Sequence, residues 1–342
     1  MPIRVWRGTA TARAGVAGNP SDALGGAALA VPVPGLLAEV ELRDAERVTV
    51  RHAAGAASWS SVGELVEQST RLGHDGGDRL VTATIVTLHR HLATQGIEPD
   101  DSPFEAVWCT GIPRSVGLAG SSALVIATLR ALASRWALDL EPPDVARLAL
   151  DAEVAELGIA AGWMDRAVQA HGAPTLVDVR EDPTASIPPM HVIDPGGALD
   201  LLAVWDPAGA SPSGRLHRSL RARSDAGDPE VSTAVDGLVD AARAAAAAVR
   251  SADVDALGAA VARSCELRAR LGALDTRTAE LVEAVRSAGG VATSAGSGGA
   301  VLAVPLRVDA AELARRLGLV GLPAAAVPLR PSDPGPARRE HH

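Results

Sequence analysis

The sequence contains no lysine, so all 32 positions counted as Lys or Arg are arginines. A Walker P-loop needs a lysine to reach the transferring phosphate, and a protein kinase needs one on its third strand. Schiff-base chemistry also depends on a lysine amine. The absence of lysine therefore excludes the two commonest ATP-site designs and Schiff-base catalysis.

Aromatic residues and cysteines are scarce as well. Aromatics make up 2% of the chain, with no tyrosine, one phenylalanine and six tryptophans, so the core must be built mainly from Ala, Val and Leu. Cys109 and Cys265 lie far apart and outside any CxxC or histidine-containing pattern, which disfavours a disulfide framework and a zinc site. We expect both to be buried, unreactive thiols.

Long apolar runs and concentrated positive charge are also missing. No stretch of about 18 uncharged apolar residues occurs, and the N-terminus lacks the apolar core of a signal peptide. The net charge is −9, and no basic stripe with interleaved aromatics is present. The sequence therefore predicts a cytoplasmic protein whose partners are small molecules, with neither nucleic acid nor membrane among them.

The chain has the composition and length of a two-domain globular enzyme. Apolar residues make up 47% and charged residues 21% of the chain, which is ordinary for a globular enzyme. Its length of 342 residues is more than one hydrophobic core usually organises. A segment dense in Pro and Gly at 181–198 suggests the junction. We therefore predict domains at 1–185 and 186–330, followed by a disordered tail at 331–342.

Apolar periodicity outlines an α+β arrangement. Short apolar runs separated by turn residues predict strands within the first 50 residues, and three- and four-residue spacing predicts a helix from Leu80 to His91. Phe104 to Thr110 is typical of a buried strand. Further segments are a helix from 142 stopped by Gly158, a strand at 199–205, helices at about 230–250, 253–270 and up to 287, and a Gly-rich hairpin around 294–299.

A glycine-rich loop leads directly from the strand at 104–110 into a helix, in the segment PRSVGLAGSSALVIATLRAL. Helix N-termini offer unpaired N–H groups, and small residues let these donors close around a phosphate. Gly117, Gly120, Ser121 and Ser122 would form that cradle, and the Ser122 hydroxyl could also reach a Mg²⁺ ion. The alternative is that a serine only caps the helix and the glycines only form a turn.

This segment resembles the second conserved motif of the GHMP kinase superfamily, P-x-x-x-G-L-x-S-S-A, here with one extra residue. TARAGVAGNPSDALGG resembles the first motif, which contributes to the acceptor pocket, and TSAGSGGAVLAV resembles the third, which closes over the phosphates. Within the superfamily the sequence is most similar to the glucuronokinase group, through GNPSD-x-x-GG, IPR-x-x-GL-x-GSSA and ELGI-x-AG-x-x-DR. The resemblance covers most of residues 8–304.

The resemblance implies roles for several side chains. Asp165 matches the family's carboxylate beside the acceptor hydroxyl, and an upstream acid binds Mg²⁺, for which Glu153 is preferred over Glu156. Without the family match, Asp165 could be the exposed start of a helix. The third motif places Gly296, Gly298 and Gly299 over the phosphates of ATP.

The first motif would hold the acceptor. Asn19 and Asp22 are expected to bind sugar hydroxyls, although capping of a local turn is an alternative for each. Arg13 occupies a position near the transferring phosphate where several relatives carry a basic side chain. A carboxylate on the substrate would need an arginine, and the candidates are Arg114, Arg215, Arg221 and Arg223.

The resemblance implies an α+β GHMP kinase fold: an N-terminal ATP-binding domain and a C-terminal ferredoxin-like domain with the active site between them. The implied activity is phosphorylation of a sugar at its anomeric hydroxyl, with D-glucuronate as the leading acceptor and ATP and Mg²⁺ required. Arabinose, galactose, fucose or a mevalonate-like acceptor are alternatives within the family. A non-catalytic metabolite sensor is an alternative outside enzymes; retention of Asp165, Ser122 and the third loop favours catalysis.

Overall fold

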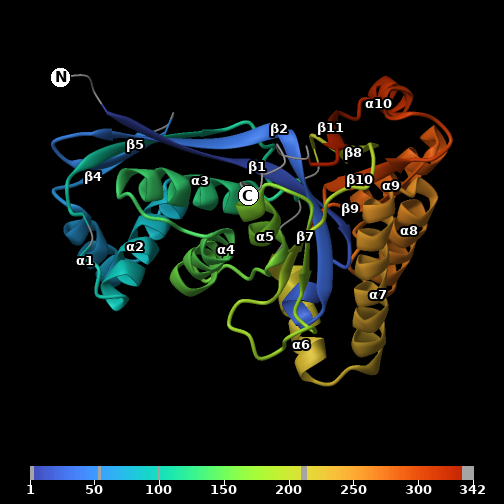
Figure 1. Cartoon of the computed structure of the whole chain (residues 1–342), viewed down its shortest axis with the longest axis horizontal. Coiled ribbons are helices and arrows are strands. Elements are labelled where there is room, and N and C mark those ends of the chain that lie inside the picture. Colours follow the sequence, from blue (N-terminus) through green and yellow to red (C-terminus); the bar gives the residue numbers. More distant parts are fainter. Residues whose placement is uncertain (1–3, 53–54, 99, 209–213, 333–342) are drawn as a thin grey trace, which may run out of the picture.

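The computed structural model describes residues 4–332 except 53, 54, 99 and 209–213. It contains a long sheet covered by helices and a second, smaller sheet packed beside the pair α7 and α8 (Figure 1). Most of the tail predicted at 331–342 lies outside the described residues. No helix in the described part is long and apolar enough to span a bilayer.

The first sheet has seven strands in the order β4-β3-β5-β2-β6-β7, with β1 paired to β2. Strand β2 pairs with β5 through Ala38–Asp44 and with β6 through Ala27–Ala30, so it joins the two halves of the sheet. The strands are β1 (Val5–Ala17), β2 (Ala27–Asp44), β3 (Val48–His52), β4 (Gly55–Trp59), β5 (Phe104–Thr110), β6 (Thr175–Asp178) and β7 (Met190–Val192).

Helices cover one face of this sheet, with α3 running along β1 and β2 (Figure 1). The close approach of α3 depends on Gly8, where a Cβ atom would collide with the backbone of Ala127. The helices on this side are α1 (Val62–Leu72), α2 (Arg79–Thr94), α3 (Gly120–Arg135), α4 (Pro142–Asp151) and α5 (Met164–His171). The prediction of a β-rich start and of a strand, loop and helix at 104–135 is confirmed.

The second sheet is antiparallel, in the order β11-β8-β10-β9. With helices between β8 and β9 and between β10 and β11, this is the ferredoxin-like pattern that was expected. The strands are β8 (Leu199–Trp205), β9 (Gly290–Ser294), β10 (Ala300–Pro305) and β11 (Ala324–Leu329). The helices are α6 (Gly214–Asp225), α7 (Pro229–Ser251), α8 (Val254–Arg270), α9 (Thr276–Ala288) and α10 (Ala310–Leu319).

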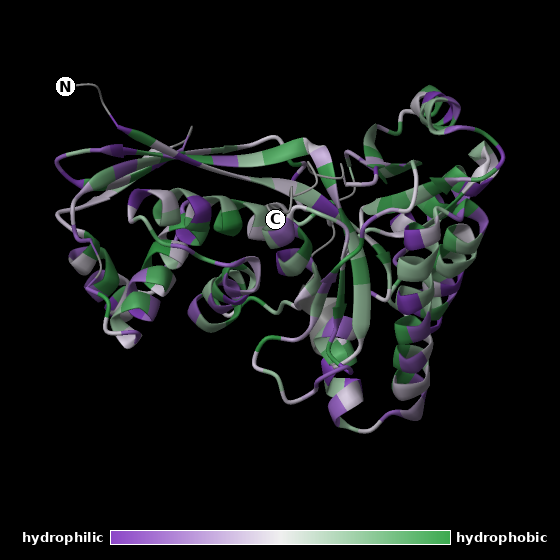
Figure 2. Ribbon diagram, in the orientation of Figure 1, coloured by the Kyte–Doolittle hydropathy of each residue, from purple (hydrophilic) through white to green (hydrophobic). Residues whose placement is uncertain are grey.

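One continuous core joins the two sheets. Helix α7 packs against β2 of the first sheet and against α8, and α8 packs against β9 of the second. Small side chains make this possible: the buried face of α7 is mostly alanine, including Ala242, Ala245 and Ala246. Hydrophobic residues concentrate in the strands and on these helix faces (Figure 2). The cavity described below lies where the loops of both halves meet.

The domain boundary near residue 185 stays a prediction; strand β7 belongs to the first sheet, and the change of sheet falls between Val192 and Leu199. The helix predicted from 142 comprises α4 and a π-helical turn (Ala152–Glu156), and it stops before Gly158, which lies in the left-handed region, as predicted. The expectation of two buried cysteines is wrong. Cys109 is exposed, because it lies on the outward-facing side of β5, and Cys265 is only half-buried.

Candidate active site

A cavity of about 570 Å³ lies where the three glycine-rich segments meet. Its size is in the range of small-molecule sites. Most of the predicted site residues line it: Arg13, Asn19, Asp22, Arg114, Gly117, Gly120, Ser121, Glu153, Asp165 and Gly296. Three predicted residues, Ser122, Gly298 and Gly299, are not part of its wall.

The loop before α3 has an unusual backbone. Ser115, Gly117 and Ala119 all have φ in the left-handed region, at 60°, 81° and 58°. When left-handed residues alternate with residues of negative φ, successive N–H groups turn toward one side and form an anion-binding concavity. Ala119 is the N-cap of α3 and forms no side-chain cap, so N–H groups of the first turn remain for a ligand.

The third glycine-rich loop lies directly against this one. A Cβ atom at Gly117 would approach the carbonyl oxygen of Gly298 to 2.6 Å, and one at Gly296 would collide with the carbonyl oxygen of Gly117. Gly296 and Ser297 face the cavity, whereas Gly299 N–H donates to Thr278 Oγ1 at 3.2 Å. The two loops therefore form one continuous backbone surface only because these positions lack side chains.

Arg13 connects both loops to the candidate catalytic carboxylate. It lies on β1 between two register shifts, at Thr11/Ala12 and at Gly15/Ala17, which turn the strand locally. Its Nε donates to Asp165 Oδ1 at 2.6 Å, and its Nη1 donates to the carbonyl oxygens of Gly117 and Ala295, both at 2.8 Å. Arg13 is buried. One guanidinium thus holds three segments that are distant in sequence.

Asp165 lies in the first turn of α5 and on the cavity wall, with its side chain 22% exposed. It is therefore at a helix start, as the alternative interpretation had it, but it faces the cavity and not bulk solvent. Arg166 Nη1 lies 3.6 Å from Asp165 Oδ2, and Arg166 Nη2 forms a buried ion pair with Glu153 Oε2. Burial alone would lower the pKa of Arg166, but Glu153 and Asp165 outweigh it and raise the pKa above its ordinary value.

Glu153 has the geometry expected of a metal ligand. It is fully buried in the π-helical turn, lines the cavity, and its Oε1 atom has no hydrogen-bond partner in the described part of the chain. A buried carboxylate oxygen without a donor fits a hard divalent cation, and π-turns are frequent at functional sites. Glu156 instead accepts from His74 Nε2 and Arg90 outside the cavity wall.

Ser122 differs from expectation. Because α3 begins at Gly120, Ser122 turns toward the core, is fully buried, and donates its hydroxyl to the carbonyl oxygen of Ala119 at 3.3 Å. Ser121 is the serine that is exposed and lines the cavity. Among the described residues no cluster of three or more His, Cys, Asp or Glu forms a separate metal site.

Asn19 and Asp22 are buried at the first-motif end of the cavity. Asp22 Oδ2 accepts the N–H of Met164 at 3.0 Å, and Asn19 Nδ2 lies 3.4 Å from the carbonyl oxygen of Gly296. Gly162 permits the first contact, since a Cβ there would collide with Asp22 Oδ2. Asp22 therefore connects the first-motif loop to the start of α5, and Asn19 connects it to the third loop. These structural roles are in addition to the expected contacts with the acceptor.

Sequence analysis missed Arg268, which is the largest fully buried side chain. Its Nη1 donates to the carbonyl oxygen of Asn19 at 2.6 Å, and its Nη2 donates to those of Gly296 and Ala273 at 2.9 and 3.2 Å. Burial lowers its pKa to about 10. Arg268 thus connects the first glycine-rich loop to the third through hydrogen bonds to their carbonyl oxygens. From the sequence, the helical spacing of apolar residues could predict that position 268 is buried, but not which groups it contacts.

We expect Arg268→Met to lower the free energy of unfolding by about 2–3 kcal/mol, because the buried carbonyl groups of Asn19 and Ala273 lose their Arg268 donor and that of Gly296 loses one of several. The KM values for both substrates should rise, since both loops lose a shared anchor. Urea denaturation and steady-state kinetics measure these effects. Arg270→Met, an exposed site two residues on, is the matched control and should stay within about 0.5 kcal/mol. Equal stability of the two variants would contradict the anchoring role.

Comparison with known proteins agrees with this geometry. Residues 79–173 match the GHMP kinases N terminal domain and residues 231–321 match the GHMP kinases C terminal model, together more than half of the chain. The chain is 28% identical to a probable glucuronokinase 2 of Arabidopsis thaliana, over 94% of this chain and 92% of that protein, and 26% identical to glucuronokinase 1 of the same plant, over 85% and 82%.

Solved structures share the fold at lower identity. Lactococcus lactis galactokinase complexed with galactose superimposes with a TM-score of 0.74 at 16% identity, over 96% of this chain and 94% of that one. Methanococcus jannaschii mevalonate kinase superimposes with a TM-score of 0.74 at 15% identity, over 96% of this chain and 99% of that one. With both family models matched in order and the three loops meeting at one cavity, the chain belongs to the GHMP kinase family.

Proposed function

We propose that the protein transfers the γ-phosphoryl group of ATP to the anomeric hydroxyl of a sugar, D-glucuronate being the acceptor. The observation that carries the proposal is the Arg13 junction, which links Asp165 to both phosphate loops through three hydrogen bonds of 2.6–2.8 Å. Two relatives that the chain matches over most of its length are named glucuronokinases, which supports the choice of acceptor.

The geometry supports direct in-line transfer by positioning and charge neutralisation. Backbone N–H groups of the loop before α3 bind phosphate oxygens, and Gly296 and Ser297 cover them from the opposite side. Asp165 accepts a hydrogen bond from the attacking hydroxyl and takes its proton as transfer proceeds. Arg13 fixes that carboxylate and adds positive charge where phosphate charge accumulates.

Magnesium would be held by Glu153 through its unpartnered Oε1, together with the Ser121 hydroxyl and phosphate oxygens of the nucleotide. When bound, the ion neutralises charge on the phosphates. Arg166 keeps Glu153 in place and balances its charge in the absence of the ion. We assign phosphate binding chiefly to the part built on the first sheet, with the 294–299 hairpin of the second part closing over it.

The test is ADP release with Mg·ATP across D-glucuronate, galacturonate, galactose, arabinose, fucose and mevalonate, with the product located by phosphorus NMR. We expect selective turnover of glucuronate to a 1-phosphate. The Asp165→Asn protein serves as the background for uncoupled ATP hydrolysis. Preferred turnover of a different acceptor would overturn the assignment of glucuronate, and ATP binding without turnover across the panel would favour a metabolite sensor.

A further inference from the structure

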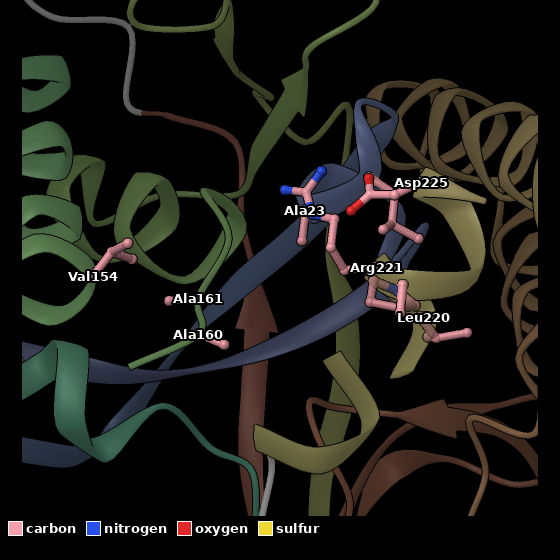
Figure 3. Close-up of a pocket in the computed structure, with 10 residues that line it drawn as sticks. Ala23, Val154, Ala160, Ala161, Leu220, Arg221 and Asp225 are labelled. Carbon is pink, nitrogen blue, oxygen red and sulfur yellow. The ribbon is translucent and has the colours of Figure 1, made fainter. Parts of the chain in front are cut away.

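A second cavity of about 350 Å³ borders the first (Figure 3). Ala160 and Ala161 line both cavities, so the segment that leads into α5 and Asp165 is their shared wall. The volume suffices for part of a small ligand. The remaining lining residues come from the first-motif segment, the π-turn and α6: Pro20, Ala23, Leu24, Val154, Leu220, Arg221, Ala222 and Asp225.

The pocket has an apolar wall with two charged side chains, Arg221 and Asp225, both from α6. They are four positions apart (i, i+4), which places them on one face of the helix. Figure 3 shows both charged groups together at one side of the pocket. Within the described part of the chain, the Arg221 side chain forms neither an ion pair nor a hydrogen bond. Its N–H donors therefore remain for a ligand.

The other candidate arginines have different surroundings. Arg223 pairs with Asp228 and Glu230 and is not part of the pocket wall. Arg114 lies on the loop before α3, among the groups that face phosphate, and lines only the first cavity. The side chain of Arg215 lies outside the described residues. Among the candidate arginines whose side chains the structure describes, Arg221 is therefore the one that lies next to the acceptor segments and forms no hydrogen bond or ion pair there.

We propose that this pocket binds the carboxylate of an anionic sugar and that Arg221 is the residue that selects it, an inference that rests on the proposed kinase function. In a hexuronate the carboxylate is attached to C5, across the ring oxygen from the anomeric carbon. A sugar with its anomeric hydroxyl at Asp165 therefore extends its carboxylate into an adjoining subsite. A guanidinium matches a carboxylate in a bidentate manner, with two parallel N–H···O hydrogen bonds.

Asp225 sets the balance of charge in this subsite. Its carboxylate offsets the charge of Arg221 and opposes a second anion, so removal of the negative charge should favour an acidic acceptor. We therefore expect Asp225→Asn to lower the KM for glucuronate, and Arg221→Gln to raise it by about 10- to 100-fold with a smaller change in kcat. Arg221→Lys should recover part of the loss.

The experiment compares glucuronate with its neutral amide, glucuronamide, in steady-state kinetics of the wild type, these three variants and the control Arg223→Gln from the same helix. The ratio of kcat/KM for acid over amide should collapse in Arg221→Gln and persist in Arg223→Gln. Because Arg221 is exposed, the variant should fold, and its thermal unfolding midpoint verifies this.

Failure of this inference and failure of the proposed function give different results. If the wild type phosphorylates glucuronate and Arg221→Gln does so with an unchanged acid-to-amide ratio, the assignment of Arg221 is overturned while the kinase function stands. If the wild type does not use glucuronate but phosphorylates neutral sugars, the proposed acceptor and the carboxylate pocket both fall.

Discussion

Asp165→Asn should reduce kcat by about two to four orders of magnitude while the Kd for ATP stays within about twofold. Asparagine retains the shape of the side chain and accepts a hydrogen bond from Arg13 Nε, but it cannot take the proton of the attacking hydroxyl. The proposed phosphate cradle consists of backbone groups of the loops at 115–120 and 296–297, which do not depend on this carboxylate. Single-turnover phosphoryl transfer and fluorescence titration with an ATP analogue measure the two quantities.

The matched control is Asp139→Asn, an exposed aspartate outside both cavities. It should leave kcat and Kd unchanged. The thermal unfolding midpoint of each variant separates a loss of chemistry from a loss of structure. A kcat for Asp165→Asn within a factor of a few of the wild type would remove Asp165 from the mechanism and leave positioning as its only role.

The glycine-rich loops that line the cavity could be predicted from sequence because their requirement is local. Gly117 must accept a positive φ and the close approach of Gly298, and no other residue type does both without strain. The strand at 104–110 and the helix after Gly120 have unambiguous apolar spacing. A glycine cluster between such segments is thus visible before any tertiary structure is known.

Other features could not be derived in this way because they depend on long-range packing. The choice between Ser121 and Ser122 turns on the residue at which α3 begins, and a shift of one residue moves a hydroxyl from the cavity to the core. Strand β7 joins the first sheet by pairing with β6, which no composition change marks. Arg268 and the Arg13 junction involve partners more than 100 residues away in sequence.

Two buried arginines, Arg13 and Arg268, connect the loops of the site in this chain, which contains no lysine. Arg13 contacts three segments, and Arg268 contacts one of them, the 294–299 hairpin, together with Asn19 and Ala273; both use N–H groups that point in different directions. An ammonium group presents its donors from a single atom, whereas a guanidinium spreads five over a rigid plane. The absence of lysine thus coincides with a site whose loops are joined by guanidinium groups.

Arg13→Met should lower kcat by about 10²- to 10³-fold and the free energy of unfolding by about 2–4 kcal/mol. The carbonyl oxygen of Gly117 loses its buried donor, that of Ala295 keeps only the N–H of Gly15, and Asp165 loses the group that holds its Oδ1 atom. Arg13→Lys should fall between the wild type and Arg13→Met, because it restores the charge but cannot reach all three acceptors at once. Steady-state kinetics and urea denaturation of both variants measure the effects.

Arg7→Met on the same strand is the control, since Arg7 is exposed and its ion pair within the described residues is a surface pair with Glu41. It should change neither kcat nor stability by a measurable amount. If Arg13→Lys matched the wild type in kcat, charge alone would explain the residue and the three-way junction would have no catalytic value. If Arg13→Met kept its kcat and lost only stability, the junction would be a structural feature, and the charge needed at the phosphate would have to come from Mg²⁺ and the backbone donors.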